Sequence, residues 1–130
     1  MASLICVFLV SCGMVLGHHG GATVVDEANN NTVVRVHEHA RLEVILHSSY
    51  WGMHGSSRPS VLSQDGPSVL LPPPPGGCLP GVGCRPVETV FTAEHPGVAV
   101  VTASRTTCGE ALLCTTYSQS HYRIVVIVTR

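Results

Sequence analysis

The chain has 130 residues, of which 12% are charged, and its formal net charge is −1 at pH 7. This length fits one domain, and a charge so close to zero provides no net field that would attract nucleic acid or anionic lipid. The seven lysine-plus-arginine positions are all arginine. Enzymes that need a lysine as a Schiff-base amine, a P-loop cation or a general base are therefore excluded.

The N-terminal stretch, residues 1–17, is typical of an export signal, although a positively charged start is missing. Its apolar run, residues 4–16, is too short to span a bilayer of about 30 Å as a helix. Within it, residues 9–13 (LVSCG) resemble a bacterial lipobox, in which Cys12 would be lipidated and become the first mature residue. The alternatives are ordinary cleavage after Gly17 and a buried N-terminal strand or helix. Both cleavage routes predict that the mature chain is secreted or held at the cell surface.

Residues 18–31 (HHGGATVVDEANNN) are rich in glycine and asparagine, which predicts a flexible tether before a domain at residues 32–130. Two β-rich runs follow, at residues 32–36 (TVVRV) and 41–47 (RLEVILH). The four residues HEHA separate them, so they form either a hairpin-like pair or successive strands.

The loop after the second run, SSYWGMHGSSRP, brings Ser48, Ser49, Tyr50 and Trp51 together. Many Ig-like sandwiches bury a tryptophan between their sheets, and Trp51 is a candidate for that role. Tyr50 is the better candidate for contact with a partner.

The second half of the chain alternates short apolar runs with turn signals. Short candidate strands at residues 60–62 and 68–71 precede PPPPGGC, a polyproline II segment that cannot pair in a central strand. Three longer β-rich runs follow at 87–93, 97–105 and 121–129. The last (HYRIVVIVT) is almost continuously apolar, which predicts a central strand. About seven short strands predict an all-β, Ig-like antiparallel β-sandwich, with a small barrel as the alternative.

Two pairs of cysteines share one spacing, Cys78 with Cys84 in GGCLPGVGCRP and Cys108 with Cys114 in CGEALLC. An exported chain favours disulfides, and four cysteines allow three pairings. We expect the two local pairings, because each closes a small ring over residues that permit a turn. A Cys₄ zinc site is the alternative, but five residues separate each pair, whereas paired zinc ligands are usually about two to four residues apart.

The eight histidines raise the question of a metal site. His37 and His39 would share one face of a strand, but two imidazoles seldom hold a metal without a third ligand. Ser48 beside His47 is only adjacency in sequence, and no G-x-S-x-G motif is present. We therefore expect neither an enzyme nor a cofactor.

The order of these segments is similar to that of a known family. RLEVILHSS with Trp51, then GVGC, then VFTAEHPGVAVVTASR and finally YRIVVIV follow one another as in chagasin-type inhibitors of papain-like cysteine proteases, which the chain resembles from about residue 31 to residue 130. Members of that family are Ig-like sandwiches that present three loops from one end.

The family's loop motifs are matched in part. Gly81, Val82 and Gly83 match the first three positions of a Gly-x-Gly-Gly loop, with Cys84 in place of the last glycine. Arg105 matches the arginine of an Arg-Pro-Trp loop, where Thr-Thr replaces Pro-Trp. The Asn-Pro-Thr-Thr-Gly peptide of the first loop is absent from HSSYW.

Together with the predicted export signal, the resemblance implies an exported protein-binding module and, more specifically, an inhibitor of papain-like cysteine proteases that acts through three loops. The alternative is a cell-surface structural or metal-handling lipoprotein. We expect a monomer that binds no nucleic acid and touches a membrane only through a lipid anchor. The predicted protein-binding residues are Ser48, Ser49, Tyr50, Trp51, Gly81, Val82, Gly83, Arg105, Thr106 and Thr107.

Overall fold

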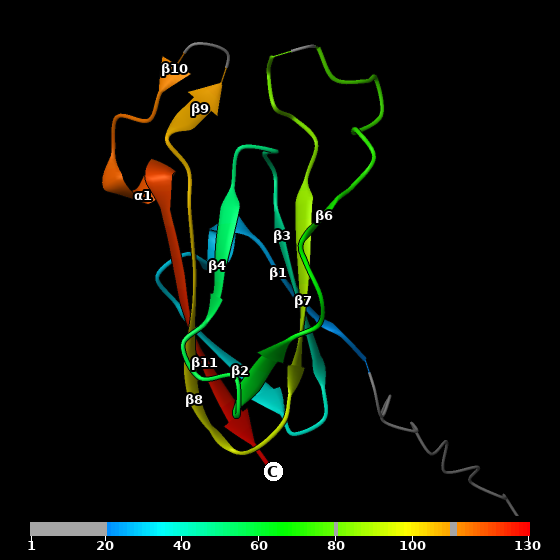
Figure 1. Ribbon diagram of the computed structural model, residues 1–130, viewed down its shortest axis with the longest axis vertical. Coiled ribbons are helices and arrows are strands. Elements are labelled where there is room, and N and C mark those ends of the chain that lie inside the picture. The colour runs from blue at the N-terminus through cyan, green and yellow to red at the C-terminus, as the bar shows by residue number, and fades with distance from the viewer. Residues whose placement is uncertain (1–20, 80, 110–111) are drawn as a thin grey trace, which may run out of the picture.

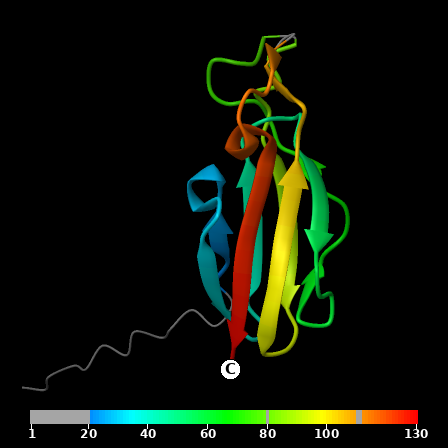
Figure 2. The same cartoon turned by 90° about the vertical axis from the view of Figure 1, so that its left-hand side faces the viewer.

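The computed structural model describes residues 21–79, 81–109 and 112–130. Two β-sheets pack face to face around one core, and a small two-stranded ribbon extends from one end of this sandwich (Figures 1 and 2). The predicted all-β, Ig-like class is therefore confirmed. The predicted export signal, including Cys12, lies outside the described residues.

Sheet A contains five strands. β1 runs parallel to β3, β3 pairs antiparallel with β7, and β7 also pairs with β5 and β6. The strands are β1 (Thr23–Val25), β3 (Arg41–Leu46), β5 (Leu62–Gln64), β6 (Val69–Leu70) and β7 (Val87–Ala93).

Sheet B contains four strands in the order β2-β11-β8-β4. β11 is parallel to β2 and antiparallel to β8, so the most apolar strand is central, as its sequence predicts. The strands are β2 (Val33–His37), β4 (Gly52–Ser56), β8 (Gly97–Ser104) and β11 (His121–Thr129).

The core is formed by alternate residues of these strands. In β3, Leu42, Val44 and Leu46 are buried and the residues between them face outward, which is the period of two expected for a sheet with one covered face. Full burial of such a side chain stabilises the fold by about 1.5–3 kcal/mol. Trp51 also lies in this core, where its ring meets that of Tyr122 edge to face. The prediction that Trp51 is a core tryptophan is confirmed.

The turn between β2 and β3 takes the chain from sheet B to sheet A, so these runs are successive strands and not a hairpin. β2 ends at His37, and His39 has a positive φ of 71°. The alternation that would place both imidazoles on one strand face therefore stops before His39. The expectation that His37 and His39 share one strand face is therefore wrong. Neither histidine belongs to a three-ligand group among the described residues.

Two strands lie where the sequence indicates tether or loop. The described part of the predicted tether, residues 21–31, is not a flexible tether throughout, since Thr23–Val25 forms β1 and Val25 is only 4% exposed. β4 consists largely of residues that disfavour strands, and it pairs with β8 across a register shift near Gly55, whose φ is 102°. Its neighbours in sheet B therefore override its weak local propensity.

The connection between β8 and β11 has structure of its own. It contains a two-stranded ribbon, β9 (Thr107–Gly109) with β10 (Leu112–Leu113), and a single helical turn, α1 (Tyr117–Ser120). Thr116 caps α1 with its hydroxyl group. Among the described residues, no helix has the length and apolar character needed to cross a membrane.

Candidate protein-binding site

Three segments meet at one end of the sandwich, at the top of Figure 1. We call them loop 1 (residues 47–51, between β3 and β4), loop 2 (residues 71–86, between β6 and β7) and loop 3 (residues 105–120, between β8 and β11). Pro80 of loop 2 and residues 110–111 of loop 3 are outside the described residues. This gathering is what the sequence predicts for an Ig-like sandwich.

Loops 1 and 2 are joined by direct contacts. The Tyr50 hydroxyl donates a 2.6 Å hydrogen bond to the Gly81 carbonyl, and the Ser49 amide donates a 2.8 Å hydrogen bond to the Gly83 carbonyl. The Tyr50 ring lies directly against Gly83, where a Cβ would come within 2.3 Å of the ring carbon Cε2. Tyr50 thus holds loop 2 in place and uses its hydroxyl within the molecule.

Loop 2 is also closed within itself. Cys78 and Cys84 form a disulfide, with their Cα atoms 5.8 Å apart. At the base of the loop, the Arg85 side chain donates a 2.9 Å hydrogen bond to the Leu71 carbonyl, and the Leu71 amide donates to the Pro86 carbonyl. These hydrogen bonds hold the two ends of loop 2 together. They restrict the conformation of a long loop that contains no regular strand.

Loop 3 carries the second disulfide, Cys108–Cys114, so both predicted local pairings are present. The Arg105 side chain donates a 2.7 Å hydrogen bond to the Gln119 carbonyl, and the Cys114 amide donates to the Thr106 carbonyl. An open hollow of about 390 Å³ lies beside these groups and is lined by Ser104, Arg105, Thr106, Leu113, Cys114, Ser120 and His121.

Arg105 connects loop 3 to loop 1. Its Cζ atom lies 4.5 Å from the centre of the Trp51 ring, which is cation–π geometry. Partial burial lowers the pKa of Arg105, and the nearby Glu27 carboxylate opposes this effect. A guanidinium group remains charged under all ordinary conditions. A cation is therefore fixed at the junction of two loops, over the one tryptophan of the chain.

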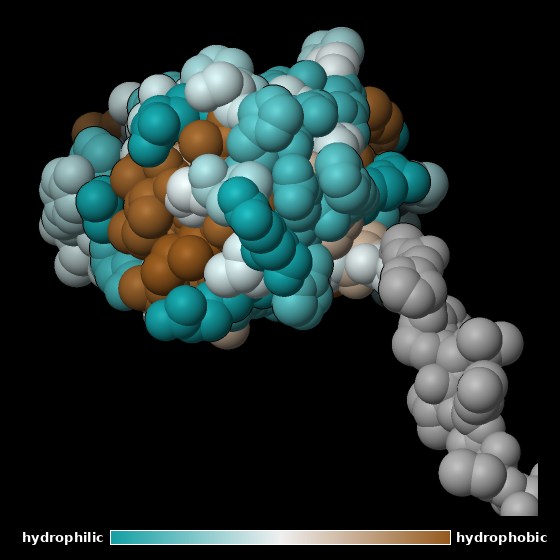
Figure 3. Space-filling model, turned by 90° about the horizontal axis from the view of Figure 1, so that it is seen from below, coloured by the Kyte–Doolittle hydropathy of each residue, from teal (hydrophilic) through white to brown (hydrophobic). Residues whose placement is uncertain are grey.

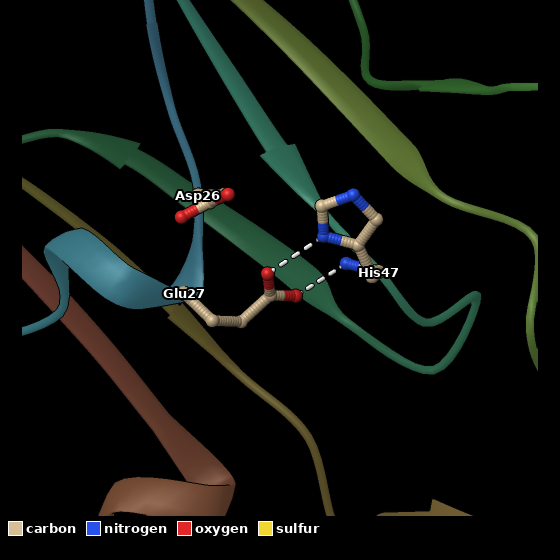
Figure 4. A group of neighbouring side chains, drawn as sticks. All are labelled: Asp26, Glu27 and His47. Atoms are coloured by element: carbon tan, nitrogen blue, oxygen red, sulfur yellow. Dashed lines mark hydrogen bonds and ion pairs between the residues drawn. The ribbon is translucent and has the colours of Figure 1, made fainter.

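A cluster of carboxylates and an imidazole lies at the start of loop 1 (Figure 4). Both carboxylate oxygens of Glu27 accept hydrogen bonds from His47, one from its backbone amide and one from Nδ1 at 2.8 Å. Asp26 beside them caps the 3₁₀ turn η1 (Glu27–Asn29) by accepting from the Ala28 amide. Ligand atoms of Asp26, Glu27 and His47 lie within 4.8 Å of one another. Because both Glu27 oxygens accept hydrogen bonds from His47, the cluster joins the N-terminal segment to loop 1.

The ten predicted binding residues all lie at this end, but they differ in what they can touch. Ser48 and Trp51 are buried, while Ser49, Tyr50, Gly83, Arg105 and Thr107 are partly covered. Gly81, Val82 and Thr106 are exposed. The buried members can support a contact surface but cannot form one without moving.

Sequence reasoning missed four exposed apolar side chains at the same end. Leu79 of loop 2 is 76% exposed, and loop 3 exposes Leu112, Leu113 and Tyr117 to a similar degree. Tyr117 stacks on His121 with ring centres 3.9 Å apart. The three leucines lie inside the seven-residue rings that the disulfides close, where a side chain cannot reach the core. Their position between paired cysteines could have predicted their exposure from the sequence.

Fold and site together define a class, an Ig-like β-sandwich with three braced loops at one end. The cysteine protease inhibitor EhICP2 from Entamoeba histolytica has a similar fold, with a TM-score of 0.59 and 8% identity over 87% of this chain and 100% of that one. Amebosin, known from a solution structure, has a TM-score of 0.57 and 17% identity over 85% of this chain and 100% of that one. No protein-family model matches the chain, and no curated protein sequence matches it significantly. The likeness shows a shared fold, as expected from the resemblance to chagasin-type inhibitors.

Proposed function

We propose that this protein inhibits papain-like cysteine proteases and that loops 1, 2 and 3 enter the protease cleft as one wedge. The observation that carries the proposal is the bracing of all three loops against one another, by Tyr50 between loops 1 and 2 and by Arg105 between loops 1 and 3. A surface fixed before binding loses little conformational entropy when it docks, which favours affinity. The similar fold of one cysteine protease inhibitor supports the proposal.

The wedge differs from the family pattern in loop 3. Where the family has Arg-Pro-Trp, this chain has Arg105 followed by two threonines and then a disulfide-closed ribbon. Leu112 and Leu113 are exposed on that ribbon, 65% and 76% respectively. We propose that these leucines supply the apolar contact that Pro-Trp supplies in the family, and that Arg105 acts from beneath as a positioning residue.

Export is part of the same proposal. Two disulfides fit an extracellular or secreted protein. We propose that residues 1–17 direct export and that Cys12 is lipidated. Cys12→Ala should then move the protein from the membrane fraction to the medium. Unchanged fractionation, or a mature N-terminus at His18, would show that Cys12 is not the anchor.

The inhibitor proposal is tested by the apparent inhibition constant against papain. We expect competitive inhibition by the parent chain, and a rise of about tenfold in the constant for Leu113→Ser, the loss expected for one interface anchor. Val24→Ser is the matched control, because Val24 is also an exposed aliphatic residue but lies on sheet A. A folded parent chain that fails to inhibit papain-like proteases would refute the proposal.

A further inference from the structure

Charged residues are divided unequally between the two sheets. The strands of sheet B contain two arginines and three histidines, and no aspartate or glutamate. In sheet A both signs occur, and Arg41 lies 4.0 Å from Glu43. The net charge of −1 for the whole chain hides this difference, which becomes visible only when the strands are assigned to their sheets.

Five aliphatic side chains form a patch on the outer face of sheet B. Val125 of β11 pairs with Val33 of β2 and with Val100 of β8. Ile127, the next outward residue of β11, pairs with Val98 of β8. Residues i and i+2 of a strand share a face, so these five side chains are neighbours across three strands. Figure 3 shows a hydrophobic area on the side where sheet B lies, surrounded by hydrophilic residues.

Two arginines border this patch. Arg35 pairs with Ile127 across the β2–β11 ladder, and Arg123 lies two residues before Val125 on the same face. Both side chains are exposed, and neither forms a salt bridge with any described residue. The face therefore combines aliphatic surface with cations that have no carboxylate beside them in the sheet.

The composition of the patch favours one kind of occupant. A second copy of the same face would bring four arginines together without a carboxylate from either sheet B. Hot spots of protein interfaces are enriched in tryptophan, tyrosine and arginine and lie in well-packed pockets; this face offers two arginines but no aromatic residue. A layer of anionic lipid headgroups needs no pocket, supplies the missing negative charge and accepts aliphatic side chains at its boundary.

We propose that the outer face of sheet B lies on a membrane surface that carries anionic lipids, with Arg35 and Arg123 on lipid phosphates and the valines and isoleucine among the headgroups. This contact is separate from the inhibitor wedge, and it departs from the expectation that the protein touches a membrane only through a lipid anchor. The patch lies toward the end of β11 that is farther from loop 3, so a docked molecule keeps its three loops away from the contact.

The site would give the proposed lipid anchor a second point of attachment. Residues 12–20 could span at most about 30 Å of extended chain, so an anchor at Cys12 would keep the domain close to the bilayer. The contact with sheet B does not depend on that anchor.

The mature exported chain can be titrated with vesicles of phosphatidylcholine alone and of phosphatidylcholine with about one-third phosphatidylglycerol. Every variant shares one N-terminus, so an anchor contributes equally to all of them. We expect about tenfold tighter partitioning to the anionic vesicles, and loss of this preference at high salt. The double variant Arg35→Gln/Arg123→Gln should abolish the preference, and Ile127→Thr should weaken binding while keeping a strand-compatible residue.

Arg41→Gln on sheet A is the matched control, and circular dichroism of each variant separates lost binding from lost folding. Equal binding to both kinds of vesicle, or the same loss with Arg41→Gln, would overturn the proposal. Self-association that Ile127→Thr abolishes, without any preference for anionic vesicles, would identify the face as a dimer interface and would also overturn it. Papain inhibition should be unchanged in these variants, so failure here is distinguishable from failure of the inhibitor proposal.

Discussion

The ring of Tyr50 occupies the space that a side chain at position 83 would need. A Cβ at Gly83 would lie 2.3 Å from one ring carbon and 2.6 Å from a second. The φ of Gly83 is +66°, in the left-handed region that favours glycine. Loop 1 and loop 2 are therefore fitted to each other at this pair, and neither residue can be changed without affecting the other.

The first prediction concerns this pair. Gly83→Ala should destabilise the fold or detach Tyr50 from loop 2, and it should raise the apparent inhibition constant against papain at least about tenfold. Gly76→Ala is the control, since Gly76 also has a positive φ, of 94°, but a Cβ there would meet nothing within 4 Å. Gly76→Ala should show only the cost of placing a side chain on a left-handed backbone, about 1–2 kcal/mol. Urea unfolding and inhibition assays on both variants give the comparison.

A double-mutant cycle separates the steric clash between a side chain at position 83 and the Tyr50 ring from the backbone strain at Gly83. Tyr50→Ala removes the ring, so Gly83→Ala should cost less in that background than in the parent chain. Additive losses would show that the ring and Gly83 act independently.

The second prediction concerns Arg105, whose guanidinium group covers Trp51 and holds Gln119. Arg105→Met keeps an aliphatic side chain but removes both interactions, and it should lower the free energy of unfolding by about 1–2 kcal/mol. Arg105→Lys keeps the charge but loses the planar donor group, so its free energy of unfolding should lie between those of the parent and of Arg105→Met. Chemical unfolding followed by Trp51 fluorescence measures all three. A methionine variant as stable as the parent would contradict the role assigned to Arg105.

The fold was readable from the sequence wherever burial repeats with period two. β3, β7, β8 and β11 match their predicted runs to within one residue. β4 was not predicted, because Gly52–Ser56 gains its strand from pairing with β8 and has little strand propensity of its own. β1 was hidden because it has three residues, fewer than a periodic pattern needs.

The sequence predicted which loops form the site, but not the direction in which their side chains point. The chain order placed three loops at one end, but it could not show that Tyr50 turns inward to Gly81 while Leu112 and Leu113 face outward. Those directions depend on contacts between residues about thirty positions apart and on a ribbon closed by a disulfide. The sum of charges likewise concealed a cationic sheet, since the strands of sheet B contain arginine and no carboxylate, whereas sheet A contains residues of both signs.

The third prediction concerns Tyr122, whose hydroxyl donates a 3.0 Å hydrogen bond to the Asp26 carbonyl. Burial raises the pKa of Tyr122, and Glu27 and Asp26 raise it further. The folded state therefore keeps its proton at a pH where the unfolded chain loses it, and stability should fall as pH rises above about 10. Tyr122→Phe should cost about 1 kcal/mol at neutral pH and should flatten this alkaline decline. The free energy of unfolding of the parent and of Tyr122→Phe should be measured at pH 7 and at about pH 11. An equally large loss of stability in both proteins would contradict the role assigned to Tyr122.

The fourth prediction separates the two disulfides by their effect on binding. Each closes a ring of the same length, so Cys78→Ser/Cys84→Ser and Cys108→Ser/Cys114→Ser should lower the free energy of unfolding by similar amounts, about 2.4 kcal/mol on the chain-entropy estimate. Loop 2 keeps its bonds to Tyr50 and Ser49 without its disulfide, whereas the described residues of β9 and β10 form no hydrogen bond to loop 1. Loss of Cys108–Cys114 should therefore raise the inhibition constant more than loss of Cys78–Cys84 does, because Leu112 and Leu113 would have to be ordered on binding. Unfolding and inhibition assays on the two variants, each compared with the parent, decide the question. A larger loss of inhibition in the loop 2 variant would move the main contact from the leucines to the glycines of loop 2.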